Sequence, residues 1–165
     1  MSSDLPQYIT PERLAIEGVH LEGEVGLNEM ARLAKLLADN RGMVNLKLVF
    51  GRNENGLTCI TGSYETELQL TCQRCLEPVT VKLAETINVG ITFAGSANKL
   101  PASVEPLVLM QDTILLADFI EEEILLDLLL SPMHDLQECA AGEQFMQRDN
   151  TASSPFHVLE KLKSG

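Results

Sequence analysis

The cysteines are the residues of this 165-residue chain whose spacing most clearly suggests chemistry. Cys72 and Cys75 form a Cys-x-x-Cys turn, CQRC, between two strand-like stretches. Two thiols at this spacing can bind one tetrahedral metal ion or close a redox disulfide. Zinc needs two more ligands, and His134 and Cys139 in SPMHDLQEC are the nearby residues of suitable type. The chain is therefore a candidate for zinc binding by Cys72, Cys75, His134 and Cys139.

Two other interpretations of the cysteines stay open. They can be buried structural thiols, which is the simplest explanation for Cys59 on its predicted strand. A redox pair has less support, because a helix N-terminus normally stabilises the first thiolate of such a pair and no helix is predicted after CQRC. Metal-binding, structural and redox thiols are thus the alternatives, and zinc is the candidate cofactor.

Motifs for catalysis are absent from the chain. It contains no GxSxG, no glycine-rich phosphate loop and no HExxH. Glu121, Glu122 and Glu123 are consecutive on a predicted helix, so their carboxylates spread around it and do not converge on one ion. We therefore expect a protein that is not an enzyme and has no small-molecule substrate.

Length and composition indicate one globular domain. The chain is 45% hydrophobic and 22% charged, which is enough apolar content to bury a core. No apolar stretch approaches the roughly 18 residues of a membrane-spanning helix, and the N-terminus shows no secretory signal. We predict a single α+β domain over residues 1–139, located in the cytosol and without membrane contact.

Hydrophobic periodicity predicts the elements that must position these side chains. Alternation of apolar and polar residues predicts strands over 14–25, 44–50, 57–70, 79–93 and 107–109. We expect bulges near Gly18 and Gly62 and a hairpin turn at Asn55-Gly56. Helical spacing predicts a helix from Asn28 to Asp39. The expected fold is a curved, mostly antiparallel β-sheet, with a barrel as one form of it, packed by two helices.

The second predicted helix has the sequence ILLADFIEEEILLDLLL. We expect it to begin with Asp112 as N-cap and to end at Pro132. Its apolar stripe consists of Leu116, Phe119, Ile120, Ile124 and Leu128. On this spacing Glu121 and Glu122 face away from the stripe, and Glu123 lies beside it.

Negative charge is concentrated in the second half of the chain. The formal net charge is -12. Residues 100–147 hold ten acidic residues and no basic one, whereas residues 1–99 hold twelve acidic and nine basic residues. A surface with this negative charge repels a phosphate backbone and does not suit broad binding of nucleic acid. A solvated surface and a docking face for a basic partner are the two explanations.

Two segments lack a clear period. AGSANKLPASVEP, residues 94–106, is a loop by composition and a candidate mobile insertion. Residues 140–165 are expected to form a disordered, polar tail. The tail ends in PFHVLEKLK, residues 155–163, which has enough apolar character for a short docking segment.

Three motifs together resemble those of the YceD family, bacterial and plastid proteins associated with accumulation of large-subunit ribosomal RNA. They are LTCQRCLEP, DFIEEEILLDLLLSPMHDLQEC and the C-terminal PFHVLEKLK, in the family's order. By resemblance, the residues to note are Cys72, Arg74, Cys75, Leu76, Pro78, Glu122, Glu123, Pro132, His134, Cys139, Pro155, Phe156, Leu159 and Lys163.

The resemblance implies a non-enzymatic ribosome biogenesis factor that supports accumulation or processing of large-subunit (23S) rRNA. Because the chain is acidic, we expect it to dock to a ribosomal protein, an assembly factor or a precursor particle. The residues expected to contact the partner are Arg74, Glu121, Glu122, Glu123, Pro155, Phe156, Leu159 and Lys163. Direct rRNA contact through Arg74 stays open. The alternative is a thiol-redox or metal-responsive regulator that uses CQRC.

Overall fold

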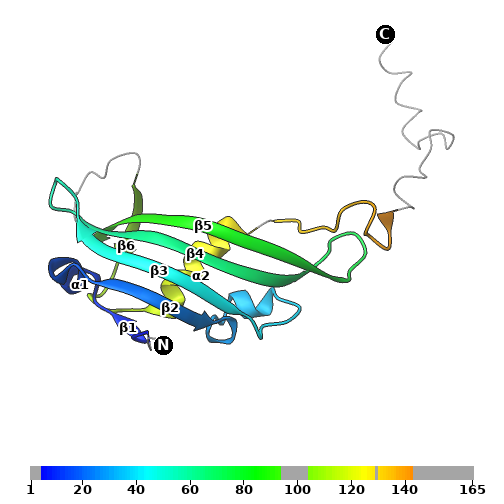
Figure 1. Ribbon diagram of the computed structural model, residues 1–165, viewed down its shortest axis with the longest axis horizontal. Helices are drawn as coiled ribbons and strands as arrows, with labels where there is room; N and C mark the ends of the chain where they lie inside the picture. The colour runs from blue at the N-terminus through cyan, green and yellow to red at the C-terminus, as the bar shows by residue number, and fades with distance from the viewer. Residues whose placement is uncertain (1–4, 94–103, 129, 143–165) are drawn as a thin grey trace, which may run out of the picture.

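The structure is a computed structural model, and it describes residues 5–93, 104–128 and 130–142 (Figure 1). The described elements, in chain order, are β1 (Tyr8–Ile9), α1 (Pro11–Glu17), β2 (His20–Gly26), η1 (Leu27–Glu29), η2 (Leu33–Lys35), β3 (Met43–Arg52), β4 (Thr58–Thr71), β5 (Pro78–Phe93), β6 (Glu105–Leu109), β7 (Ile114–Leu115) and α2 (Leu116–Asp127). η1 and η2 are single 3₁₀ turns.

The main sheet has the strand order β2-β3-β4-β5-β6, and α2 lies across one of its faces (Figure 1). All neighbouring strands are antiparallel except β5 and β6, which are parallel. The α+β class with a mostly antiparallel sheet is therefore confirmed. The sheet is open, since β2 and β6 do not pair with each other in the described part of the chain.

Period-two alternation is confirmed along the three long strands. In β3 each second residue is buried from Val44 to Phe50. The same face continues through the even-numbered residues of β4 and the odd-numbered residues of β5, because the register pairs Leu46 with Tyr64 and Leu68 with Val81. The apolar side chains on this face form the core under α2.

The predicted hairpin turn is confirmed and the predicted bulge is wrong. Gly56 has a φ of +74°, and the side chain of Asn53 accepts hydrogen bonds from the backbone N–H groups of Asn55 and Leu57. Gly62 pairs directly with Leu48 in an unbroken register. A Cβ at position 62 would collide with the carbonyl of Lys47, so close approach of two strands explains this glycine.

The predicted strand over 14–25 is wrong in its first half. Residues Pro11–Glu17 form helix α1, which has proline at its first position and buries Pro11 and Ala15. Gly18, expected at a bulge, ends this helix in the left-handed conformation with a φ of +63°. The strand begins only at His20.

The predicted helix from Asn28 to Asp39 is also wrong, although its apolar residues Met30 and Leu33 are fully buried. The segment contains the 3₁₀ turns η1 and η2 instead. An α-helix would require the N–H groups of Arg32 and Leu33 to bond to carbonyls four residues earlier. They donate to the carboxylate of Glu121 on α2 instead.

Helix α2 is shorter than predicted at both ends. Asp112 is not its N-cap, because Ile114 and Leu115 form strand β7, which pairs with β1. The N–H of Leu116 donates to the carbonyl of Gln7, which joins the start of α2 to the N-terminal strand. The helix ends at Asp127, before Pro132 is reached.

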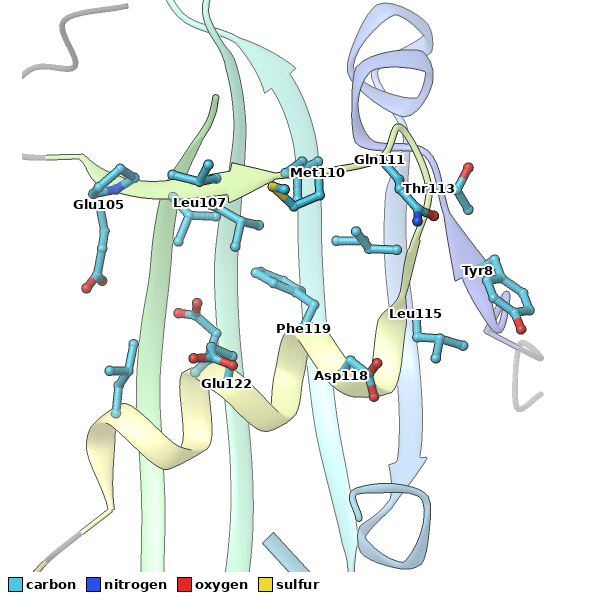
Figure 2. Close-up of a pocket in the computed structure, with 17 residues that line it drawn as sticks. Tyr8, Glu105, Leu107, Met110, Gln111, Thr113, Leu115, Asp118, Phe119 and Glu122 are labelled. Atoms are coloured by element: carbon cyan, nitrogen blue, oxygen red, sulfur yellow. The ribbon is translucent and has the colours of Figure 1, made fainter. Parts of the chain in front are cut away.

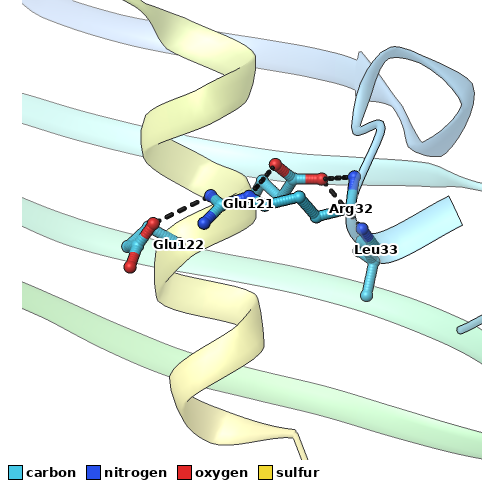
Figure 3. Close-up of polar contacts among 4 residues, drawn as sticks. All are labelled: Arg32, Leu33, Glu121 and Glu122. Atoms are coloured by element: carbon cyan, nitrogen blue, oxygen red, sulfur yellow. Dashed lines mark hydrogen bonds and ion pairs between the residues drawn. The ribbon is translucent and has the colours of Figure 1, made fainter. Parts of the chain in front are cut away.

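The expected outward orientation of Glu121 is wrong. Its side chain is only 3% exposed, whereas that of its neighbour Glu122 is 52% exposed. Figure 3 shows Glu121 directed at η2, where Oε1 accepts hydrogen bonds from the N–H of Arg32 at 2.6 Å and of Leu33 at 2.8 Å. Oε2 pairs with Nε of Arg32 at 2.7 Å, and the same guanidinium reaches Glu122 at 2.8 Å.

These contacts determine the ionisation of Glu121. Burial raises the pKa of its carboxyl, but the N–H of Leu33 and the side chain and N–H of Arg32 outweigh burial and lower it. Glu121 is therefore an ionised internal cap that fastens α2 to η2.

Two predicted segments fall mostly outside the described residues. The loop 94–106 includes residues 94–103, and the tail 140–165 includes residues 143–165, which the structure does not describe. The last residues of the predicted loop, Glu105 and Pro106, belong to strand β6. Among the described residues, no helix has the length and apolar character to cross a membrane.

We expect Glu121→Ala to lower the free energy of unfolding by about 2–4 kcal/mol, because it leaves two N–H groups and a guanidinium without their acceptor. Glu122→Ala removes a half-exposed ion pair and should cost at most about 1 kcal/mol. Urea unfolding of both variants measures the difference. Equal losses would contradict the capping role.

The loss should also depend on pH with a defined sign. The pKa of Glu121 is lower in the folded protein than its ordinary value of 4.5. Its contribution is therefore complete above pH 4.5 and disappears as the pH falls through the folded pKa.

Candidate metal centre

The CQRC turn connects the ends of β4 and β5. The N–H of Cys72 donates to the carbonyl of Glu77, and the N–H of Leu76 donates to the carbonyl of Cys72, both at 2.9 Å. Leu76 takes a positive φ of 65°, so the chain curls back within five residues. This turn brings the thiols of Cys72 and Cys75 to the same side, where Cys72 is completely buried.

The chain that follows α2 lies against this turn. The N–H of Gln73 donates to the carbonyl of Pro132 at 2.9 Å, which anchors the segment two residues before His134. Nδ1 of His134 lies 3.3 Å from Sγ of Cys75. Its Nε2 lies 3.0 Å from the carbonyl oxygen of Pro78. A carbonyl only accepts, so Nε2 carries the proton and Nδ1 presents its lone pair toward the thiols.

Cys139 completes the cluster from a second turn. Its N–H donates to the carbonyl of Asp135 at 3.0 Å, and its carbonyl accepts from Gly142 at 2.7 Å. A Cβ at position 142 would collide with the carbonyl of Leu136, so this tight turn requires glycine. Cys139 is 5% exposed, and its thiol points into the cluster.

The structure brings together the four candidate ligands Cys72, Cys75, His134 and Cys139. Their three sulfur atoms and one nitrogen lie within 4.8 Å of one another. Zinc–sulfur bonds of about 2.3 Å and zinc–nitrogen bonds of about 2.0 Å around a tetrahedral ion require a cluster of about this size. All four described cysteines are free, so no disulfide competes for these thiols. The residues present therefore fit a tetrahedral zinc ion.

The thiols of the turn have unequal acidities. Burial raises the pKa of Cys72, but hydrogen bonds from the N–H groups of Cys75, His134 and Arg74 outweigh burial and lower the pKa to about 5. For Cys75, the N–H of Glu77 lowers the pKa, while burial and the thiols of Cys72 and Cys139 raise it above its ordinary value. One thiolate is thus stabilised before any ion binds, as a zinc ligand requires.

Cys59 lies outside this cluster. Its thiol donates to the carbonyl of Leu57 at 3.5 Å, and burial raises its pKa. This environment agrees with the prediction of a small core residue.

The residues predicted for partner contact are scattered. Arg74 is half-buried in the CQRC turn and places its guanidinium 3.6 Å from the sulfur of Met133. Of the three glutamates on α2, only Glu122 is substantially exposed, because Glu123 is 9% exposed. Pro155, Phe156, Leu159 and Lys163 lie outside the described residues.

Sequence reasoning missed a polar link at the end of α2. The hydroxyl of Tyr64, on β4, donates to Asp127 at 2.5 Å. Burial and this carboxylate raise the pKa of Tyr64 well above its usual range, so the phenol keeps its proton. The only sequence signal was a tyrosine on the core-facing parity of a strand, where a buried hydroxyl needs a partner.

Glu123 occupies an unfavourable position for a charge. Burial and, to a smaller extent, the nearby carboxylates of Glu105, Asp127 and Glu122 together raise its pKa to about 7. The carboxyl is thus partly protonated near neutral pH.

Comparison with known proteins adds independent information. The family model described as large ribosomal RNA subunit accumulation protein YceD matches residues 60–163. A protein of Haemophilus influenzae has the name large ribosomal RNA subunit accumulation protein YceD. It is 28% identical to this chain over an alignment of 171 positions, and the alignment covers 96% of this chain and 96% of that protein. No solved structure matches the chain.

Untagged protein should contain one zinc ion per chain. We expect Cys72→Ser and Cys139→Ser to lose the metal, whereas the matched variant Cys59→Ser keeps it, because only Cys59 is outside the cluster. Elemental analysis and thiol titration measure this. Chelation should lower the melting temperature by about 5–10 °C, which corresponds to roughly 3 kcal/mol in a domain of this size. Equal zinc in Cys59→Ser and Cys139→Ser would contradict the assignment.

Glu123→Gln should stabilise the protein at pH 8 by about 1–2 kcal/mol and have little effect at pH 4. Between pH 4.5 and 7 the folded protein holds a proton on Glu123 that the unfolded chain has released. The contribution of Glu123 to stability therefore falls as the pH rises through this window. Urea unfolding across the range tests it, and a parallel shift at all pH values would refute the assigned pKa.

Proposed function

The chain belongs to the YceD family, and from this premise we propose that it is a non-enzymatic factor supporting the accumulation of large-subunit ribosomal RNA in the cytosol. The observation that carries the proposal is the family match over residues 60–163, whose described part holds both halves of the Cys/His cluster. The relative from Haemophilus influenzae carries the same description over nearly its whole length.

We propose that the metal centre is structural. Three thiols and one imidazole provide a complete tetrahedral ligand set from the protein, as in structural zinc sites. Zinc bound there would supply four bonds that hold the segment after α2 against the β4–β5 turn. The centre would then keep the segment 132–142 in place beside the sheet.

The thiol-redox alternative has weaker support. The low pKa of Cys72 suits either a zinc ligand or a redox thiol. However, a redox pair has no need of His134 and Cys139, whose ligand atoms approach both thiols of the turn. The CQRC turn is followed by strand β5 and not by a helix. We therefore favour the zinc interpretation.

We infer that the factor acts by docking to a protein of the large subunit, an assembly factor or a precursor particle. The net charge of -12 opposes broad contact with rRNA. Of the three glutamates predicted to contact the partner, Glu121 serves the fold and Glu123 is buried, so Glu122 is the one that is accessible at the surface. Arg74 remains a candidate for a local rRNA contact, and Pro155, Phe156, Leu159 and Lys163 for docking by the tail.

Sedimentation of cell extract tests the proposal. We expect the protein to migrate with precursors of the large subunit, and its depletion to lower large-subunit rRNA relative to small-subunit rRNA. The Cys139→Ser variant should fail to restore the rRNA, while Cys59→Ser restores it. Unchanged rRNA after depletion, with all of the protein at the top of the gradient, would overturn the proposal.

A further inference from the structure

A cavity of about 700 Å³ lies between β6, the turn into β7, and α2. Figure 2 shows Leu107 and Met110 on its β6 side and Phe119 directed toward them from α2, which also contributes Asp118 and Glu122 to the lining. None of the four residues of the Cys/His cluster lines it. The cavity is therefore a separate feature of the described molecule.

The rim of this cavity exposes large apolar side chains. Met110 is 83% exposed, Leu126 63%, Tyr8 58% and Val108 56%. They come from three different elements and meet around one cavity. Exposed apolar residues gathered in this way typically mark an interaction site, whereas isolated ones need no explanation.

The charge of the cavity has a single sign. Its acidic lining residues are Glu105, Asp118, Glu122 and Glu123, and no lysine, arginine or histidine is among the described lining residues. The side chain of Glu122 is paired with Arg32. The same cavity therefore combines apolar anchoring surface with acceptors for cationic groups.

We propose that this cavity binds a basic segment of a partner protein, in which lysine or arginine side chains alternate with apolar anchors. The inference rests on the proposed function and specifies how the docking is made. Exposed Met110 and Val108 would receive the apolar side chains, because methionine adapts to irregular surfaces. Glu105 and Asp118 would pair with the cations and steer their approach.

Charge complementarity selects this occupant over others. An RNA strand would bring phosphates against the exposed carboxylates of Glu105 and Asp118. A second copy would place one acidic cavity against another surface of an acidic chain. The chain's own residues 155–163 offer two lysines against one glutamate, which is weaker complementarity than a basic partner can provide.

Photo-crosslinking tests the site with defined probes. A photoreactive residue is placed at position 110 or, as the matched control, at position 43, because Met43 is also exposed but lies on β3 outside this cavity. The probes are tiled peptides of the large-subunit ribosomal proteins, copies with serine in place of their apolar residues, and a large-subunit rRNA fragment. We expect crosslinks from position 110 only, and only to lysine- or arginine-rich peptides that retain their apolar residues.

Affinity measurements complete the test. Met110→Ser with Leu126→Ser should weaken binding of the crosslinked peptide about tenfold, the size expected when two anchors are lost. The matched pair Met43→Ser with Leu36→Ser, also exposed residues, should change it less than twofold. Glu105→Gln with Asp118→Asn should weaken binding at low salt and flatten its salt dependence, unlike Glu24→Gln with Glu65→Gln on the opposite sheet face.

Several outcomes would overturn the inference. They are crosslinks from position 110 to RNA, to a second copy or to residues 143–165, or equal crosslinks from positions 110 and 43. If Met110→Ser with Leu126→Ser still migrates with large-subunit precursors, the cavity is wrong and the proposed function stands. If the peptide binds this cavity but the protein never migrates with precursors, the proposed function fails independently.

Discussion

The arrangement of this molecule depends on a buried carboxylate. Glu121 projects from α2 into the region around η2, where it accepts hydrogen bonds from two backbone N–H groups and pairs with Arg32. A buried charge is costly unless such partners satisfy it, so α2 has a preferred position on the sheet. That position places the cavity beside β6 and directs the following chain toward the CQRC turn.

The Cys/His cluster contributes to holding the segment after α2 against the sheet. Beyond α2 the described chain leaves the large apolar side chains of Leu130, Met133 and Leu136 exposed. Such a segment gains little from burial in the core. Its order depends on the hydrogen bond from Gln73 to Pro132 and on the approach of His134 and Cys139 to the turn. A metal bond is an efficient way to order a segment that has little core of its own.

The acidic half of the chain divides into groups with different environments. Glu121 is ionised and internal, Asp127 accepts the hydroxyl of Tyr64, and Glu123 resists ionisation. Glu105 and Asp118 remain at the surface beside exposed apolar side chains. The same residue type thus supports the fold at one position and is available for recognition at another, and the burial and bonding partners of each carboxylate distinguish them.

What the sequence determined by itself is local. Alternation along β3, β4 and β5 has period two whatever the strands contact, and the Asn55-Gly56 turn follows from the conformational freedom of glycine. The four candidate metal ligands could be selected by type, because few other side chains bind zinc. The family resemblance could also be recognised from the sequence alone, because each of its motifs is a short, continuous stretch of residues.

Only the tertiary structure decided which local preference was fulfilled. The apolar spacing after Asn28 fits an α-helix, yet Glu121, 88 residues beyond Leu33, takes the N–H groups that such a helix would use. Helical spacing alone placed Glu121 on the solvent-facing side of α2, and its burial follows from contact with the segment around Arg32 and Leu33. The metal ligands show the same limit, because Cys75 and His134 are 59 residues apart and their 3.3 Å approach depends on how α2 lies on the sheet. Sequence periodicity does not predict bonds between distant segments, because it reports only the distribution of apolar and polar residues within one segment.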